Sequence, residues 1–140
     1  MARYQVVIGR SEKLAIANIV LNVPVKIDTG AYRSSIHCSS AKVIKRGDTK
    51  LLAVKLLGHP TSPTVYDMTF SDYEKVSVTN SFGQEEQRYE VKLRIKLGPS
   101  VATTSFTLAD RSNNLFPALV GRKLLKGRFF VDVARVGVDR

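Results

Sequence analysis

The sequence predicts an all-β protein, either a barrel or a sandwich. Short apolar runs alternate with turn signals along the chain, and the one helical pattern, at 122–126, is barely one turn long. The clearest element is 88–97, where apolar and charged residues alternate with a period of two. A length of 140 residues indicates one domain, 1–140.

The predicted strands follow one another in short steps. β-branched and apolar runs place them at 4–8, 16–21, 23–27, 34–38, 51–57, 64–70, 76–79, 88–97, 103–109, 118–120 and 129–134. Asn22 is expected to join the second and third of these strands. Turns are predicted at 58–60, 80–83 and 98–100, where Gly stands with Pro, Asn or Ser. Gly83 suits the positive φ of a tight hairpin.

Composition and charge restrict the class of partner. The net charge is +10, with basic residues concentrated in the first 60 and last 30 positions, which favours acidic partners or simply a solvated basic surface. Nucleic acid is disfavoured, because no Lys/Arg run is interleaved with aromatic residues. No stretch of ~20 apolar residues exists that could span a membrane. The single cysteine, Cys38, excludes an internal disulfide and suits a cytoplasmic protein.

The segment Asp28-Thr29-Gly30-Ala31 is the candidate site. The apolar residues of 23–27 run directly into Asp28, and strand character returns at 34–38, so the carboxylate lies on a tight loop between two strands. Gly30 permits close approach of a backbone, and Ala31 leaves space for a substrate. An ordinary turn has the same local pattern, so this motif alone leaves the choice open.

A second motif identifies a family resemblance. Leu119-Val120-Gly121 precedes the short helical turn, and together with the Asp28 segment it resembles the retropepsin-type aspartic proteases. The nearest subgroup is the bacterial and archaeal family labelled "ATP-dependent zinc protease". It is similar in the turn Asn80-Ser81-Phe82-Gly83 before a Glu/Arg-rich strand, and in segments at 108–113, 116–117, 121–122 and 131–133. The resemblance extends from about residue 7 to residue 135.

The resemblance implies a fold and a set of site residues. It implies a single-lobe, closed β-barrel of the acid-protease type with one short C-terminal helix. It makes Asp28 the catalytic carboxylate, Thr29 a link between two active-site loops, and Gly30 a backbone contact for substrate. Residues 119–121 would pack under this loop. The flap tip, and with Ala31 the substrate contacts, would be Asn80, Ser81, Phe82 and Gly83, with Phe82 exposed in the free protein.

Carboxylate-based peptide hydrolysis requires two carboxylates that share one proton. The chain has one Asp-Thr-Gly, so we expect a homodimer that brings two Asp28 side chains together. Asp110 and Arg111 are interpreted as a structural pair. The predicted function is an aspartic endopeptidase without a cofactor, acting on a peptide or protein substrate, with acidic peptides among the candidates.

A zinc site is disfavoured, because there is no His-Glu-x-x-His motif. His37 is interpreted as a packed or hydrogen-bonded strand residue, and Cys38 as a small buried hydrophobic residue. Two alternative functions remain: a peptide-binding module with weak or no catalysis, and a basic protein associated with ribosomes or RNA.

Overall fold

The alternation at 88–97 becomes the central strand of the fold. In the computed structural model, which describes residues 6–80 and 82–136, β7 (Glu85–Leu97) buries its apolar residues from Val91 to Leu97 and exposes the Lys and Arg residues between them. One residue departs from this pattern. Glu90 is buried although it lies on the face of the charged residues, and its carboxylate is paired with Arg33 at 2.7 Å.

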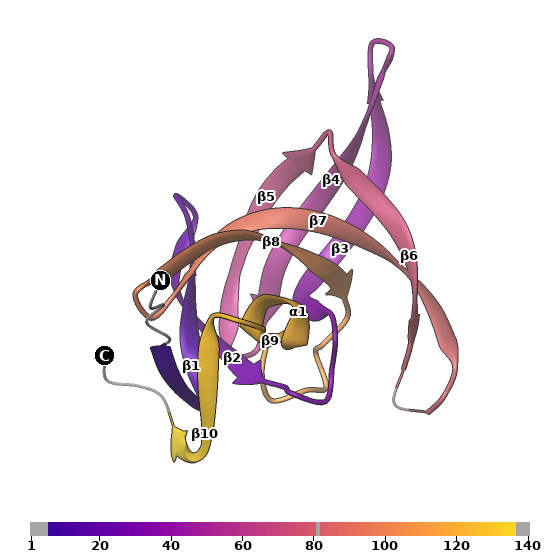
Figure 1. The fold of residues 1–140 in the computed structure, drawn as a ribbon. Helices are drawn as coiled ribbons and strands as arrows, with labels where there is room; N and C mark the ends of the chain where they lie inside the picture. The colour runs from indigo at the N-terminus through magenta and orange to yellow at the C-terminus, as the bar shows by residue number, and fades with distance from the viewer. Residues whose placement is uncertain (1–5, 81, 137–140) are drawn as a thin grey trace.

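The all-β prediction is confirmed, and the barrel is closed (Figure 1). The other elements are β1 (Val6–Ile16), β2 (Val20–Ile27), β3 (Ser34–Arg46), β4 (Thr49–His59), β5 (Ser62–Phe70), β6 (Tyr73–Thr79), β8 (Ser100–Ala109), β9 (Ala118–Val120), α1 (Arg122–Leu125) and β10 (Phe129–Val136). The strands β1, β2, β9, β3, β8 and β7 pair in that order, and β7 pairs with β1 to close the ring. Among the described residues, no helix is long and apolar enough to cross a membrane.

The strand predicted at 16–21 is wrong. β1 continues to Ile16, a turn occupies 17–19, and β2 then runs without a break through Asn22. The turn forms because Asn18 adopts a left-handed φ of 63°, which Asn tolerates better than most residues, and the Ile19 N–H donates to the Ile16 carbonyl at 3.0 Å. The apolar residues on both sides of Asn18 gave this segment the pattern of a strand. Of the strand predicted at 4–8, residues 4 and 5 lie outside the described residues.

Two extensions leave the barrel and enclose the site. The outer half of β3 pairs with β4, and β4 pairs with β5, so these strands form an antiparallel extension. In Figure 1 the β3–β4 hairpin reaches well beyond the barrel, and the β6–β7 hairpin projects on another side. β6 pairs with β7 along its whole length, from Tyr73 opposite Val91 to Thr79 opposite Glu85.

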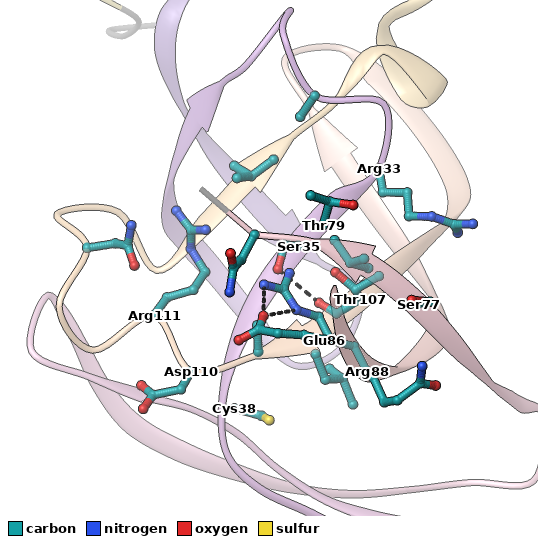
Figure 2. A pocket seen from close by; sticks show the side chains of 18 of the residues that line it. Arg33, Ser35, Cys38, Ser77, Thr79, Glu86, Arg88, Thr107, Asp110 and Arg111 are labelled. Carbon is teal, nitrogen blue, oxygen red and sulfur yellow. Dashed lines mark hydrogen bonds and ion pairs between the residues drawn. The ribbon is translucent and has the colours of Figure 1, made fainter. Parts of the chain in front are cut away.

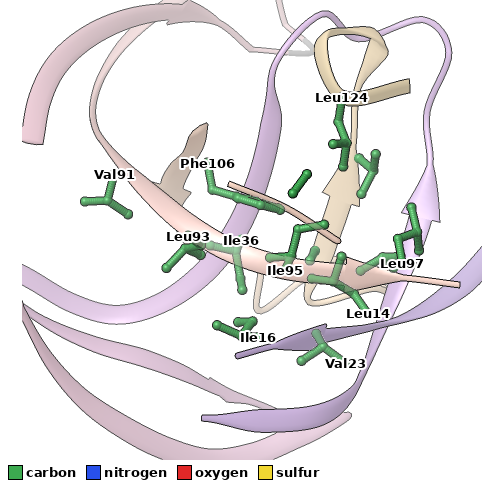
Figure 3. Close-up of a cluster of buried hydrophobic side chains, with 14 of the residues drawn as sticks. Leu14, Ile16, Val23, Ile36, Val91, Leu93, Ile95, Leu97, Phe106 and Leu124 are labelled. Atoms are coloured by element: carbon green, nitrogen blue, oxygen red, sulfur yellow. The ribbon is translucent and has the colours of Figure 1, made fainter. Parts of the chain in front are cut away.

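The core fills the barrel interior and gives the site a rigid base. Figure 3 shows side chains from β1, β2, β3, β7 and β8 meeting in one cluster, with Leu124 of α1 lying against it. Phe106 and Ile36 are fully buried, and their strands β8 and β3 run in parallel, with Ile36 opposite Leu108. The short helix packs both of its leucines inward. The ends of β2 and β9 are therefore fixed by the same core.

Candidate active site

Asp28 is the first residue after β2, and backbone hydrogen bonds hold it in place. Its N–H donates to the Val120 carbonyl at 2.9 Å, which ties it to the end of β9. Its Oδ1 accepts the Gly30 N–H at 3.0 Å, and its carbonyl accepts the Ala31 N–H at 3.2 Å. The side chain is half-buried. One carboxylate oxygen is thus held by the loop's own backbone, and this orients the group.

The β9–α1 segment supports the Asp28 loop from behind, as predicted. The Arg122 and Lys123 N–H groups donate to the carbonyls of Ala31 and Tyr32 at 2.8 and 3.0 Å. The Arg122 guanidinium also donates to the Thr29 carbonyl at 3.0 Å. The loop carbonyls therefore satisfy the first N–H groups of the short helix, which has no side-chain cap of its own.

Gly121 is required at this crossing. A Cβ at this position would lie 2.6 Å from the carbonyl oxygens of both Tyr32 and Arg33. Its N–H donates to the Ser34 Oγ at 3.1 Å. A residue without a side chain is what lets the two backbones come this close.

A cleft of about 1140 Å³ opens beside Asp28. Its walls come from the Asp28 loop, the first part of β3, the β6–β7 hairpin, and the chain from the end of β8 to Asn114. Figure 2 shows Arg88 and Glu86 of the hairpin within this space, and Asp110 and Arg111 on the loop at its side. Its volume is that of a large ligand cleft.

The predicted flap tip lies at the end of the β6–β7 hairpin. The Asn80 side chain accepts the N–H groups of Phe82 and Gln84 at 2.9 and 3.0 Å, and Gly83 has the positive φ expected, 79°. Phe82 is 87% exposed, so its predicted exposure is confirmed. Asn80 and Phe82 both line the cleft. Ser81 lies outside the described residues.

Three arginines line the cleft, and two of them are paired. Arg33 binds Glu90, and Arg88 binds Glu86 at 2.6 Å. Arg111 is half-buried, and among the described residues it has no carboxylate within ion-pair distance; its Nε donates to the Phe116 carbonyl at 3.1 Å. Burial lowers the pKa of Arg111, the charge of Arg88 lowers it further, and Asp28 partly offsets both. Arg111 is thus a partly desolvated cation whose field reaches Asp28.

Asp110 and Arg111 do not form the predicted structural pair. The Asp110 Oδ1 instead accepts the N–H and hydroxyl of Ser112 at 2.9 and 2.6 Å. These hydrogen bonds are the main cause that lowers the pKa of Asp110. The sequence reasoning therefore missed Arg111 as a cleft residue. Opposite charges next to each other suggested a pair, but the Asp110 side chain bonds Ser112 and the Arg111 side chain bonds the Phe116 carbonyl.

Cys38 lines the cleft, and His37 precedes it on β3. His37 is buried and hydrogen-bonded, which confirms its interpretation as a strand residue. Cys38 is half-buried, and burial, with a smaller effect of Asp110, raises the pKa of its thiol to about 11, so the reactive thiolate is disfavoured. The described residues include no group of three or more His, Cys, Asp or Glu side chains placed to hold a metal ion.

Comparison with known proteins gives three findings. A family model described as "RimB-like: Retropepsin-like aspartic endopeptidase RimB" matches residues 7–139. A crystal structure of a Legionella pneumophila protein of unknown function is similar, with a TM-score of 0.73 and 27% identity, covering 95% of this chain and 97% of that one. Proteins named "Probable alpha-L-glutamate ligase" are similar in Desulfotalea psychrophila (27% identity over 80% of this chain) and Shewanella pealeana (25% over 94%). The matches span only 24% and 29% of the length of these two relatives.

Replacing Gly121 with Ala should destabilise the protein by about 1–3 kcal/mol, because the new methyl group would overlap backbone oxygens that are held by hydrogen bonds. Chemical denaturation of Gly121→Ala against wild type measures this difference. Thr103→Ala, an exposed change on β8, is the control and should alter stability little. Equal stability of Gly121→Ala and wild type would show that the crossing is not close-packed.

Proposed function

This chain belongs to the RimB-like family of retropepsin-like aspartic endopeptidases, and from that premise we propose that it hydrolyses peptide bonds with Asp28 as a catalytic carboxylate. The observation that carries the proposal is the placement of Asp28. It lies at the end of a buried strand, on a loop fixed from behind by β9 and α1, and it opens into a cleft large enough for a peptide.

The second carboxylate is proposed to come from another copy of the chain. Glu86 and Asp110 also line the cleft, but Glu86 is paired with Arg88 and Asp110 caps a turn through Ser112. Neither is free to share a proton with Asp28. In a two-fold symmetric homodimer the two Asp28 side chains would meet, one activating water while the other polarises the scissile carbonyl. Thr29 is exposed beside Asp28, as a contact between two such loops requires.

The peptide would lie between the Asp28 loop and the hairpin. Gly30 and Ala31 would offer backbone contacts on one side. The hairpin residues Asn80 and Phe82, which line the cleft, would cover the peptide from the other side.

We propose that the substrate is acidic. Arg111 has no carboxylate partner among the described residues, and it stands partly desolvated in the cleft near Asp28. A desolvated guanidinium gains most from a charged carboxylate, and it binds one in bidentate fashion. Relatives named as glutamate ligases contain a segment similar to this chain, and glutamate is an acidic residue. The free Cys38 favours a reducing cytoplasm as the place of action.

Asp28→Asn should reduce peptide hydrolysis by roughly 10²–10⁴-fold or more, because the amide cannot take or give the proton while its shape is nearly unchanged. Cleavage mapping of a proteome-derived peptide library by wild type and Asp28→Asn measures the loss. Asp67→Asn, an exposed change on β5, is the control. Circular dichroism of both variants separates lost chemistry from lost folding.

The same assay includes EDTA, which should leave hydrolysis unchanged. Full activity of Asp28→Asn would refute the catalytic role. Activity lost in EDTA and restored by zinc would refute the aspartic mechanism. A wild type that binds library peptides without cutting them would favour a peptide-binding module.

Thr29→Ala should shift the enzyme toward monomer and lower its specific activity at dilute concentration, since it removes a hydroxyl from the proposed contact between loops. Sedimentation velocity over a concentration series, run beside activity measurements, checks this. In the proposed scheme, activity follows the dimer fraction for both proteins. A wild-type monomer with full activity would rule out the two-chain site.

Arg111→Gln should raise KM for a Glu-containing peptide by about tenfold, the effect of losing one charge-assisted hydrogen-bonded contact. The neutral Gln-containing counterpart should be affected little. Arg94→Gln, on the solvent-facing side of β7, removes the same charge away from the cleft and is the control. Equal effects on both peptides would show that Arg111 does not select acidic residues.

A further inference from the structure

Two buried histidines lie beside the cleft, and the proposed chemistry does not use them. His37 of β3 is 4% exposed and His59 at the end of β4 is 1% exposed. Their rings meet edge to face, with centroids 5.3 Å apart and planes at 75°. Histidine is rarely placed so deep without a function for its two ring nitrogens.

The hydrogen bonds of His59 define its tautomer. Its Nε2 lies 2.9 Å from both the Arg111 and Asn114 carbonyl oxygens. Carbonyl oxygens only accept, so the proton must be on Nε2. Its Nδ1 accepts the Thr61 N–H at 3.1 Å and lies 3.0 Å from the Thr61 hydroxyl. His59 is therefore a neutral ring that ties together two carbonyls of the loop after β8.

The hydrogen bonds of His37 define its state in the same way. Its Nδ1 accepts the Arg111 N–H at 2.8 Å, so that nitrogen carries no proton. The Asp110 carboxylate stands 3.8 Å from the same nitrogen, too far for a hydrogen bond. The His37 backbone N–H donates to the Pro117 carbonyl at 2.7 Å.

Both backbone groups of Arg111 are thus held by histidine rings, its N–H by His37 and its carbonyl by His59. This residue carries a guanidinium group in the cleft that Asp28 also lines. Two main-chain anchors, with the side-chain bond to the Phe116 carbonyl, fix where that guanidinium stands.

A local distortion of β4 aims His59 at the loop. Leu57 and Gly58 both have positive φ, 67° and 75°, at a bulge in the β4–β5 pairing. Leu57 is a buried non-glycine residue in a conformation that costs free energy. The Ser39 hydroxyl donates to the Leu57 carbonyl at 2.7 Å and holds the bulge. Bulges of this kind redirect the next side chain.

We propose that His37 and His59 are positioning residues that, as neutral rings, hold Arg111 in the cleft, and that a proton on the His37 Nδ1 releases it. A protonated Nδ1 can no longer accept the Arg111 N–H, because both groups would then be donors. The protonated nitrogen would instead donate to the nearby Asp110 carboxylate. That Arg111 matters for substrate rests on the function proposed above; that the histidines hold it does not.

The charges around His37 set the direction of this switch. Burial lowers its pKa most, His59 and Arg111 lower it further, and Asp110 opposes them. His37 therefore binds its proton at a higher pH in the unfolded chain than in the folded protein. The stability that the neutral ring contributes is fully present above the ordinary histidine pKa of 6.5, and it is lost as pH falls from there through the lowered value. Arg111 is accordingly held at neutral pH and released in acid.

Amide NMR on the full chain tests the proposal without any substrate. In wild type, the Arg111 amide shift should move with pH, with a midpoint below 6.5, in step with the His37 ring signals. In His37→Asn, the side-chain oxygen can accept the same N–H but does not titrate, so the amide should remain protected from exchange through that range. In His37→Leu the acceptor is lost, and exchange at Arg111 should be about tenfold faster at neutral pH.

Each outcome decides the question. An Arg111 amide that neither shifts nor loses protection while His37 titrates would overturn the proposal, and this requires only wild-type protein. An Arg111 amide signal that titrates in the His37→Asn variant as it does in wild type would also overturn it. A KM for Glu-containing peptide that rises in acid in wild type but not in His37→Asn would extend the switch to the proposed reaction. If no hydrolysis is found, the amide titration still tests the histidines.

Discussion

The site depends on one close contact, between the backbone at Gly121 and the carbonyls of Tyr32 and Arg33. Because no side chain separates them, β9 can pair with both β2 and β3 while α1 begins directly behind the Asp28 loop. The loop carbonyls are bound by the N–H groups that begin the helix, so each segment satisfies backbone polar groups of the other. The position of the Asp28 backbone is thus set by main-chain hydrogen bonds.

Charged side chains from several elements also line the cleft. The Arg33–Glu90 pair joins the Asp28 loop to β7, and the Arg88–Glu86 pair lies on the hairpin that faces it. Burying Glu90 would be costly without its partner, so this pair fixes how β7 passes the active loop. Arg111 differs from the other two arginines, because its side chain donates to the Phe116 carbonyl and has no carboxylate within ion-pair distance among the described residues. It keeps an unneutralised charge directed at the cleft, which is the property expected of a group that binds substrate.

Much of this could be predicted from the sequence, for reasons that are local. Alternation at 88–97 predicts a strand because its period matches the pleat, and Asp28-Thr29-Gly30 with Leu119-Val120-Gly121 indicates the loop and its support. The turn at Asn18 was missed because apolar residues flank it on both sides. The roles of Arg111 and His59 could not be found. They depend on the Leu57–Gly58 bulge and on a loop 52 residues further along the chain than His59, and no pattern within one segment contains that information.

The histidines and the proposed carboxylate pair place opposite demands on pH. Two carboxylates that share a proton need conditions acidic enough to keep that proton between them. His37 must stay neutral to hold Arg111, and acid removes that anchor. In the proposed scheme, the carboxylate pair loses its shared proton as pH rises, whereas the His37 anchor is lost as pH falls. Because burial and the charges of His59 and Arg111 lower the pKa of His37, the anchor persists further into acid than an exposed histidine would allow. The depth of this histidine pair would thus let one cleft combine the proposed acid-dependent reaction with a firmly placed cation.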